Sequence, residues 1–333
     1  MSSLFGTIKV GNDEALLRAF ARFEPHFSNP NVQEIMVNGP SDVWIETNGV
    51  MRKVEIEISE IETAGLAQLI ASRNGKNIEP GGVNGIQDAE YPGFRLAIIT
   101  NPTSTIGTAI SIRKHNPVNL NLKNLLDLDV FPQELMAYLR EIVISKKNIL
   151  ISGGTSSGKT TLLNAMVQEI DQADRVFCIE DTKEIKKSVP NWVSVVTNKQ
   201  KGVTGGLLLQ AALRFRPDRI LYGEVRGAEA LDMLTAANTG HDGMMASLHA
   251  TSADRTLARL ENMLLQSGIN WPHSAICSEI ASTFNIIIYA ARTKQGRKIT
   301  QIKEILGYDH DARRYLFNSI FERKSNVSIS CSI

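Results

Sequence analysis

Cysteine is scarce in this sequence, which narrows the chemistry open to it. Cys178, Cys277 and Cys331 are the only three among 333 residues. They lie far apart along the chain and match neither a zinc-binding spacing nor a disulfide framework. We therefore expect a protein of a reduced, cytosolic compartment.

Long apolar runs and a strong net charge are also missing. The longest apolar run, FNIIIYAA (284–291), falls far short of the ~20 residues that a spanning helix needs. The first twenty residues show no basic segment followed by an apolar one, so no signal peptide is expected. Lys plus Arg number 36 and Asp plus Glu 35, so no global basic field attracts nucleic acid, although a local patch stays open. These features indicate a soluble protein, at most peripheral to a membrane.

The chain length indicates two domains, at roughly 100–200 residues per domain. We expect residues 1–116 to form a smaller α+β domain, with helices at 13–23 and 60–73 and strands at 34–37, 42–46, 50–58, 94–100 and 108–114. The stretch NGV at 48–50 is a hairpin signal, and the Gly- and Asn-rich segment 74–93 indicates a loop. Residues 117–131 are poor in secondary-structure signals and are expected to be a linker.

The second part of the chain has a different hydrophobic pattern. KNILIS (147–152), RVFCI (175–179) and DRILYG (218–223) are short apolar runs without alternation, and helical segments separate them. Such runs are typical of a parallel sheet that is buried on both faces. The pattern predicts that residues 132–333 form an α/β nucleotide-binding domain.

A phosphate-binding loop follows the first of these runs. GGTSSGKTT (153–161) fits the pattern G-x-x-x-x-G-K-[ST], with an apolar strand before it and an apparent helix after it. Glycines let the backbone wrap closely around a phosphate, and the helix N-terminus adds its positive dipole. The residues expected to bind ATP are Gly153, Gly154, Thr155, Ser156, Ser157, Gly158, Lys159, Thr160 and Thr161. Lys159 supplies the mobile charge for the β- and γ-phosphates, and the Thr160 hydroxyl is a ligand for Mg²⁺.

Acidic side chains follow two of the other predicted strands. RVFCI runs into Glu180-Asp181-Thr182-Lys183-Glu184, and DRILYG runs into Glu224. The carboxyl ends of parallel strands form the ligand edge of such a sheet. One acid is expected to hold Mg²⁺ through water, and another to orient or deprotonate the attacking water. Solvated acids at loop starts are the alternative interpretation.

Two histidines bracket a short apolar segment in TGHDGMMASLHA (239–250). An imidazole near the γ-phosphate, from His241 or His249, could report whether that phosphate is present. A purely structural role is the alternative for each.

Together these motifs resemble those of the traffic ATPases of type IV secretion and conjugal transfer systems, within the type II/type IV secretion ATPase superfamily. IEDTKEI (179–185) is similar to the Asp box of that family. RFRPDRILYGEVRGAEALDML (214–234) is similar to its Walker B region, with Gly-Glu in place of the usual Asp. TGHDGMMASLHA resembles its His box. VQEIMVNGPSDVWIETNG (32–49), FRLAI (94–98) and SIRK (111–114) are similar to its N-terminal domain.

The resemblance implies a RecA-like ATPase domain and a ring-shaped homohexamer on the cytoplasmic face of the inner membrane. Nucleotide would be held between the two domains. ATP hydrolysis would power the assembly of a type IV secretion or conjugation apparatus, or substrate transfer through it. The implied partners are inner-membrane components of that apparatus and, indirectly, transported DNA or protein.

The resemblance also implies roles for single residues. Lys159 and Thr160 would bind phosphate and magnesium, and Glu184 would be the catalytic base, with Glu180 as the alternative acid of that box. Glu224 would position magnesium, through water, or the attacking water. His249 would sense the γ-phosphate.

Arg95 and Arg113 would reach the nucleotide from the N-terminal domain. An arginine within reach of a transferring γ-phosphoryl group can be worth ~10³–10⁵ in rate. Arg113 is expected on the face of its strand opposite Ile110 and Ile112, so it can point away from the core. Surface arginines on a sheet face are the alternative interpretation.

Several other functions stay open at this point, and the number of cysteines argues against one further class. Pilus-extension and type II secretion ATPases usually carry a four-cysteine zinc module, which this chain cannot build. Pilus retraction and tight-adherence pilus motors are not excluded by that absence. A nucleic-acid motor, a small-molecule kinase and a non-catalytic nucleotide switch are the remaining alternatives.

Overall fold

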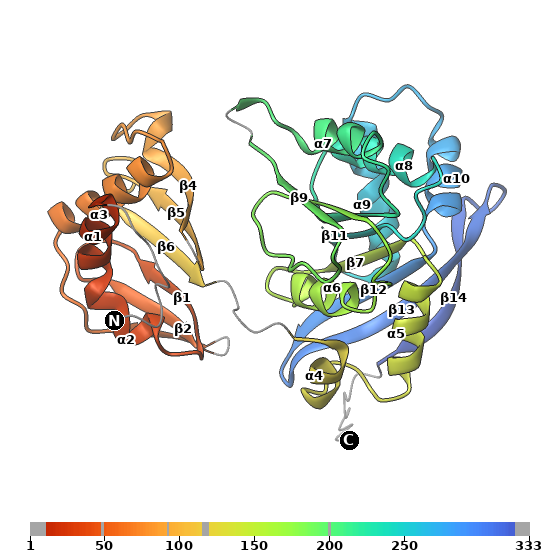
Figure 1. The fold of residues 1–333 in the computed structure, drawn as a ribbon, viewed down its shortest axis with the longest axis horizontal. Coiled ribbons are helices and arrows are strands. Elements are labelled where there is room, and N and C mark those ends of the chain that lie inside the picture. The colour runs from red at the N-terminus through yellow and green to blue at the C-terminus, as the bar shows by residue number, and fades with distance from the viewer. Residues whose placement is uncertain (1–10, 48–49, 92, 115–119, 199–200, 324–333) are drawn as a thin grey trace, which may run out of the picture. The chain divides into compact units, whose positions relative to one another are not determined.

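The fold is that of a computed structural model, which describes residues 11–47, 50–91, 93–114, 120–198 and 201–323 (Figure 1). The chain divides into two compact units, Met1–Val118 and Asn119–Ile333. Within the described ranges, no helix is both long enough and apolar enough to cross a membrane. The predicted turn at residues 48 and 49 lies outside the described residues.

The first unit is a six-stranded antiparallel sheet with helices. Its strand order is β3-β2-β1-β6-β5-β4. The strands are β1 (Val32–Val37), β2 (Val43–Thr47), β3 (Val50–Val54), β4 (Ile86–Tyr91), β5 (Phe94–Ile99) and β6 (Ala109–Lys114). The helices are α1 (Gly11–Phe20), η1 (Ala21–Phe23), α2 (Glu24–Phe27), α3 (Glu60–Arg73) and η2 (Val83–Gly85).

Local sequence explains the boundaries of α3 and the unexpected strand β4. The Ser59 side chain accepts from the Glu62 N–H, and the Glu62 side chain accepts from Ser59, so a capping box starts α3 at the predicted residue. Strand β4 lies in the segment predicted as a loop. Its inward positions include the polar Gln87, whose side-chain amide donates to the carbonyls of Asn77 and Asn84.

The second unit is built on an eight-stranded sheet in the order β14-β13-β12-β7-β11-β10-β8-β9. Strands β12 to β9 of that order are parallel, and β13 and β14 continue it as an antiparallel hairpin. The strands are β7 (Ile149–Gly153), β8 (Val176–Glu180), β9 (Trp192–Val196), β10 (Arg219–Val225), β11 (Met245–His249), β12 (Ile286–Thr293), β13 (Gly296–Asp309) and β14 (Arg314–Glu322).

Helices cover both faces of this sheet, as Figure 1 shows. Along β7, Leu150 packs into one core, whereas Ile149 and Ile151 pack into the other. Strands β7 and β8 are therefore buried throughout, which explains their continuous apolar runs. The helices are α4 (Leu122–Asp127), α5 (Leu135–Ile144), α6 (Lys159–Val167), α7 (Gly205–Ala212), α8 (Glu229–Ala237), α9 (Ala253–Gln266) and α10 (His273–Thr283).

Helix α4 lies inside the segment 117–131 that was predicted to be a linker. Asn121 caps it, exchanging hydrogen bonds with Asn124. Leu122 and Leu125 are buried in the core of the second unit. The burial of only two leucines, in a helix of six residues, is too short a pattern to stand out in sequence.

Candidate active site

The phosphate-binding loop leaves the carboxyl end of β7 and enters α6 at Lys159. Two of its glycines adopt backbone conformations that other residues avoid, with φ of 159° at Gly153 and 94° at Gly158. A Cβ on Gly153 would lie 2.2 Å from the carbonyl oxygen of Ala290 on β12. The loop therefore needs glycine for its conformation and also for its close approach to the neighbouring strand.

The loop presents its polar groups as a phosphate cradle requires. Gly154 and Thr155 are exposed, and Thr160 and Thr161 are half-buried at the start of α6. The Ser157 hydroxyl is buried without a hydrogen-bond partner among the described residues. Backbone N–H groups at a helix start and an unsatisfied hydroxyl fit a bound polyphosphate, and a threonine hydroxyl beside them fits Mg²⁺.

The Lys159 ammonium is held against the loop itself. Its Nζ donates to the carbonyls of Gly153, at 3.2 Å, and Gly154, at 2.9 Å. The side chain is only 7% exposed, and Nζ also lies 3.3 Å from Nδ1 of His249. The positive charge is therefore positioned at the mouth of the loop before any phosphate arrives.

His249 connects this lysine to a carboxylate. It ends β11 and is the register partner of Gly153. Its Nδ1 faces Lys159, and its Nε2 lies 2.8 Å from Oε1 of Glu224. Burial and the nearby Lys159 lower the pKa of His249, against the opposing effect of Glu224. In the neutral imidazole Nδ1 can accept from the lysine, whereas Oε1 of Glu224, although 2.8 Å from Nε2, has no well-formed hydrogen bond among the described residues.

Glu224 lies near the end of β10 and is ionised. Burial raises its pKa, but the hydrogen bond from Arg226 and the charges of Arg226, His249 and Lys159 more than offset this, so the net shift is downward. Nη2 of Arg226 is 2.9 Å from Oε2 of Glu224, and Nη1 of Arg226 is 3.3 Å from Oδ2 of Asp181. Arg226 thus forms ion pairs with both Asp181, which follows β8, and Glu224, which lies in β10.

Glu180 and Glu184 lie in different surroundings. Glu180 is 3% exposed, and its Oε1 accepts from the backbone N–H groups of Glu184, at 2.8 Å, and Ile185, at 2.7 Å. Burial raises the pKa of Glu180 to about 7 in spite of these bonds. Glu184 is half-buried, and its carbonyl accepts from Asn164 of α6. Glu180 therefore organises the turn that presents Glu184.

Three further predicted residues lie on other elements of the fold. His241 precedes β11 and contacts Thr239, so it lies at the amino end of the strand whose carboxyl end carries His249. Arg95 and Arg113 belong to the first unit, where they are register partners on β5 and β6. Arg113 is exposed, on the strand face opposite the buried Ile112.

One contact of the loop has no sequence motif behind it. The Nε of Arg297, at the start of β13, donates to the Ser156 carbonyl at 3.0 Å, across 141 residues of chain. The antiparallel pairing of β12 with β13 brings it there. No local pattern around Arg297 signals this contact.

The sequence of this chain is similar to those of several known proteins. A sequence model of the family described as "Type II/IV secretion system protein" matches residues 82–305. A protein of Mycobacterium tuberculosis, named provisionally for conjugal transfer, is 32% identical over 287 residues, which cover 83% of this chain and 81% of that one. The type IV secretion system protein VirB11 of Bartonella henselae is 29% identical, over 92% of this chain and 97% of that one.

The fold has a solved counterpart as well. The X-ray structure of the ATPase DotB of Legionella pneumophila matches with a TM-score of 0.60 at 20% identity, covering 90% of this chain and 82% of that chain. This likeness establishes the architecture of the chain, a RecA-like ATPase domain with a smaller α+β unit. The family model covers well over half of the sequence. The chain therefore belongs to the type II/IV secretion system protein family.

Proposed function

We propose that this protein hydrolyses ATP to power a type IV secretion or conjugation apparatus. The carrying observation is the continuous contact from Lys159 through His249 to Glu224 at the mouth of the phosphate-binding loop. A lysine for phosphate, an ionised carboxylate for magnesium or water and an imidazole between them suit transfer of a phosphoryl group to water. The names of the relatives support the assignment to secretion and conjugation.

Lys159 makes the first contact with the nucleotide in this proposal. Its ammonium exchanges the carbonyls of Gly153 and Gly154 for β- and γ-phosphate oxygens. Mg²⁺, when bound, neutralises charge on those oxygens. The Thr160 hydroxyl would hold it directly and Glu224 through water. Glu184 takes the proton of the attacking water, while Glu180 keeps the supporting turn in place.

His249 reads the state of this site. When Lys159 turns to a γ-phosphate, Nδ1 of His249 loses its ammonium neighbour, while Nε2 remains beside Oε1 of Glu224. Strand β11 carries His249 and pairs with β7. A change at His249 on nucleotide binding is therefore passed to the central strands of the sheet.

We further propose Arg95 and Arg113 as residues that stabilise the transferring γ-phosphoryl group. They lie side by side in register, opposite Glu34 of β1, so one sheet row carries two positive charges. Arg95→Ala and Arg113→Ala are expected to keep ATP affinity and lose turnover by ~10³-fold or more. Unchanged turnover in both variants would assign these arginines to the surface alone.

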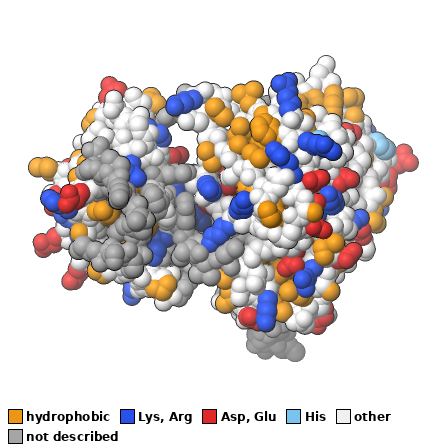
Figure 2. Space-filling model, viewed as in Figure 1, with side chains coloured by type: hydrophobic (Ala, Val, Ile, Leu, Met, Phe, Trp, Pro, Cys, Tyr) orange, Lys and Arg blue, Asp and Glu red, His pale blue; other side chains and the backbone are white. Residues whose placement is uncertain are grey.

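At the level of the assembly, we propose a homohexameric ring at the inner membrane that contacts envelope components of the apparatus and moves DNA or protein indirectly. Figure 2 shows Lys and Arg side chains interspersed with acidic ones on the visible face of the second unit, so that face does not present one continuous basic surface to DNA. The ring mass is measured by native mass spectrometry with ATP and Mg²⁺ present.

The test of this function is phosphate release by the purified chain with no acceptor present, compared with Lys159→Ala. We expect release by the wild-type chain and a loss of at least ~100-fold in the variant, in which the ammonium is missing. ATP consumption only with an added acceptor would indicate a kinase. Strong stimulation by DNA with a steep salt dependence would indicate a nucleic-acid motor. Deletion of the gene, scored separately for conjugation, secretion and piliation, then identifies the cargo.

A further inference from the structure

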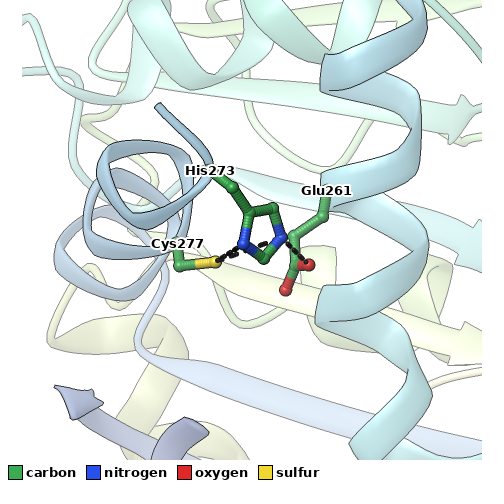
Figure 3. Close-up of side chains that lie close together, drawn as sticks. All are labelled: Glu261, His273 and Cys277. Carbon is green, nitrogen blue, oxygen red and sulfur yellow. Dashed lines mark hydrogen bonds and ion pairs between the residues drawn. The ribbon is translucent and has the colours of Figure 1, made fainter. Parts of the chain in front are cut away.

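A group of metal-ligating side chains lies away from the ATPase residues, between α9 and α10. Glu261 projects from α9, and His273 and Cys277 project from the first two turns of α10 (Figure 3). One ligand atom from each of the three lies within 4.8 Å of the others. The spacing of His273 and Cys277 places both on one helix face, where side chains four residues apart meet.

The distances from Nε2 of His273 to the other two ligand atoms differ by about 0.4 Å or less from those around a bound zinc ion. Nε2 of His273 is 2.9 Å from Oε2 of Glu261 and 3.7 Å from Sγ of Cys277. Tetrahedral Zn²⁺ with ordinary bond lengths places nitrogen and oxygen ligands about 3.3 Å apart, and nitrogen and sulfur about 3.6 Å apart. Sγ of Cys277 lies almost equally far from Nδ1, at 3.8 Å, so both ring nitrogens border the thiol, and the three ligand atoms lie within 4.8 Å of one another.

The burial of the three side chains differs in a way that suits a metal site with one open position. Cys277 is 1% exposed, whereas the side chains of Glu261 and His273 are 14% and 57% exposed. Ions can therefore enter from the side of His273. Burial raises the pKa of the Cys277 thiol, so without a cation the thiol keeps its proton.

The hydroxyl of Tyr315 closes the inner side of the group. It is buried close to the Glu261 carboxylate without a well-formed hydrogen bond. Burial, and then Glu261, raise its pKa, so this oxygen stays protonated.

We propose that Glu261, His273 and Cys277 bind one Zn²⁺, with water in the fourth position. Carboxylate, imidazole and thiolate are all ordinary zinc ligands. Binding forms bonds to Oε2, Nε2 and Sγ and releases the thiol proton to solvent, so affinity rises with pH. The ion fastens the start of α10 to α9 across the connection 267–272. Helix α9 begins four residues after His249, so the clamp fixes the helix that leads away from the active site.

The test uses the full-length protein, stripped of metal with a chelator and titrated with Co²⁺. Co²⁺ reports its ligands, because a thiolate-to-cobalt charge-transfer band appears only when sulfur is bound. The variants are Cys277→Ser and His273→Asn, and the matched control is His310→Asn. His310 is an imidazole of the same neighbourhood that bonds Ser278 instead. Zinc content by mass spectrometry and the thermal midpoint of unfolding are measured in parallel.

We expect one Co²⁺ per chain with the charge-transfer band in the wild-type protein and in His310→Asn, displaced by equimolar Zn²⁺. His273→Asn and Cys277→Ser lose the band, and Zn²⁺ no longer raises their thermal midpoint. His273 is exposed, so His273→Asn is expected to fold. It therefore decides the test even if Cys277→Ser fails to fold. A wild-type protein without the band, or a His273→Asn protein that retains it, would show that the three side chains form only a hydrogen-bonded group.

Discussion

Replacing Glu180 with glutamine is expected to change how stability depends on pH. The pKa of this carboxyl is about 7 in the fold, against 4.5 as its ordinary value, because burial disfavours the charged form. Below pH 4.5 both folded and unfolded chains carry the proton. Between pH 4.5 and 7 the unfolded chain loses it while the folded chain keeps it, so stability falls as pH rises. At about 1.4 kcal/mol per pH unit, the loss is about 3 kcal/mol.

Glu180→Gln removes this ionisation and keeps the geometry. The amide oxygen of glutamine can still accept from the N–H groups of Glu184 and Ile185. The stability of the variant relative to the wild-type chain should therefore rise by about 3 kcal/mol from pH 4.5 to pH 8. Urea unfolding at several pH values, monitored by tryptophan fluorescence, measures this difference in stability. Trp192 packs against the core that contains Val176 and Cys178 of β8, so its fluorescence reports unfolding there.

The control for this experiment is Glu180→Ala. It also removes the ionisation, but it leaves the two backbone N–H groups without an acceptor, at a cost of about 1–3 kcal/mol for each buried group. It should therefore be less stable than Glu180→Gln at every pH. Parallel stability curves for Glu180→Gln and the wild-type chain between pH 4.5 and 7 would show that this carboxyl ionises normally in the fold, and would refute the reasoning.

Three further predictions concern the active site. Glu184→Gln is expected to bind ATP and lose turnover; a larger loss in Glu180→Gln would make Glu180 the base. His249→Gln should slow steady-state phosphate release, and it should remove a fall in rate on acidification that the wild-type chain shows, because a protonated imidazole puts a positive charge between Lys159 and Glu224. Gly153→Ala should cost about 1–3 kcal/mol in urea unfolding, since its Cβ would overlap the Ala290 carbonyl; an unchanged midpoint would contradict the close packing.

The parts of the fold that sequence could predict are those with strong local patterns. Strands β7 and β8 are buried on both faces, so their apolar runs are unbroken. Strand β4 was missed because a buried glutamine, Gln87, interrupts its apolar positions; its side-chain nitrogen donates to the carbonyls of Asn77 and Asn84. The long hairpin of β13 and β14 was not predicted, because its buried isoleucines, Ile299, Ile302 and Ile305, are three residues apart, and its pairing contains register shifts that break the two-residue period of a strand.

The residues of the candidate site also divide into those with a local sequence signal and those that only tertiary packing brings together. The phosphate-binding loop, the acids after β8 and β10 and His249 could be predicted because a parallel sheet collects the carboxyl ends of its strands at one edge. The contact of Arg297 with Ser156 could not, because it depends on tertiary pairing across 141 residues. The convergence of Glu261 on His273 and Cys277 likewise depends on how two helices pack.

The most direct test of the central claim is the turnover of Glu224→Gln. This change removes the carboxylate charge at the end of the contact from Lys159 through His249, and it leaves the phosphate-binding loop unaltered. ATP affinity, from fluorescent nucleotide titration, should stay within a few-fold of the wild-type value. Phosphate release should fall by at least ~100-fold. Turnover near the wild-type rate, with ATP bound normally, would contradict the assignment of this carboxylate to catalysis.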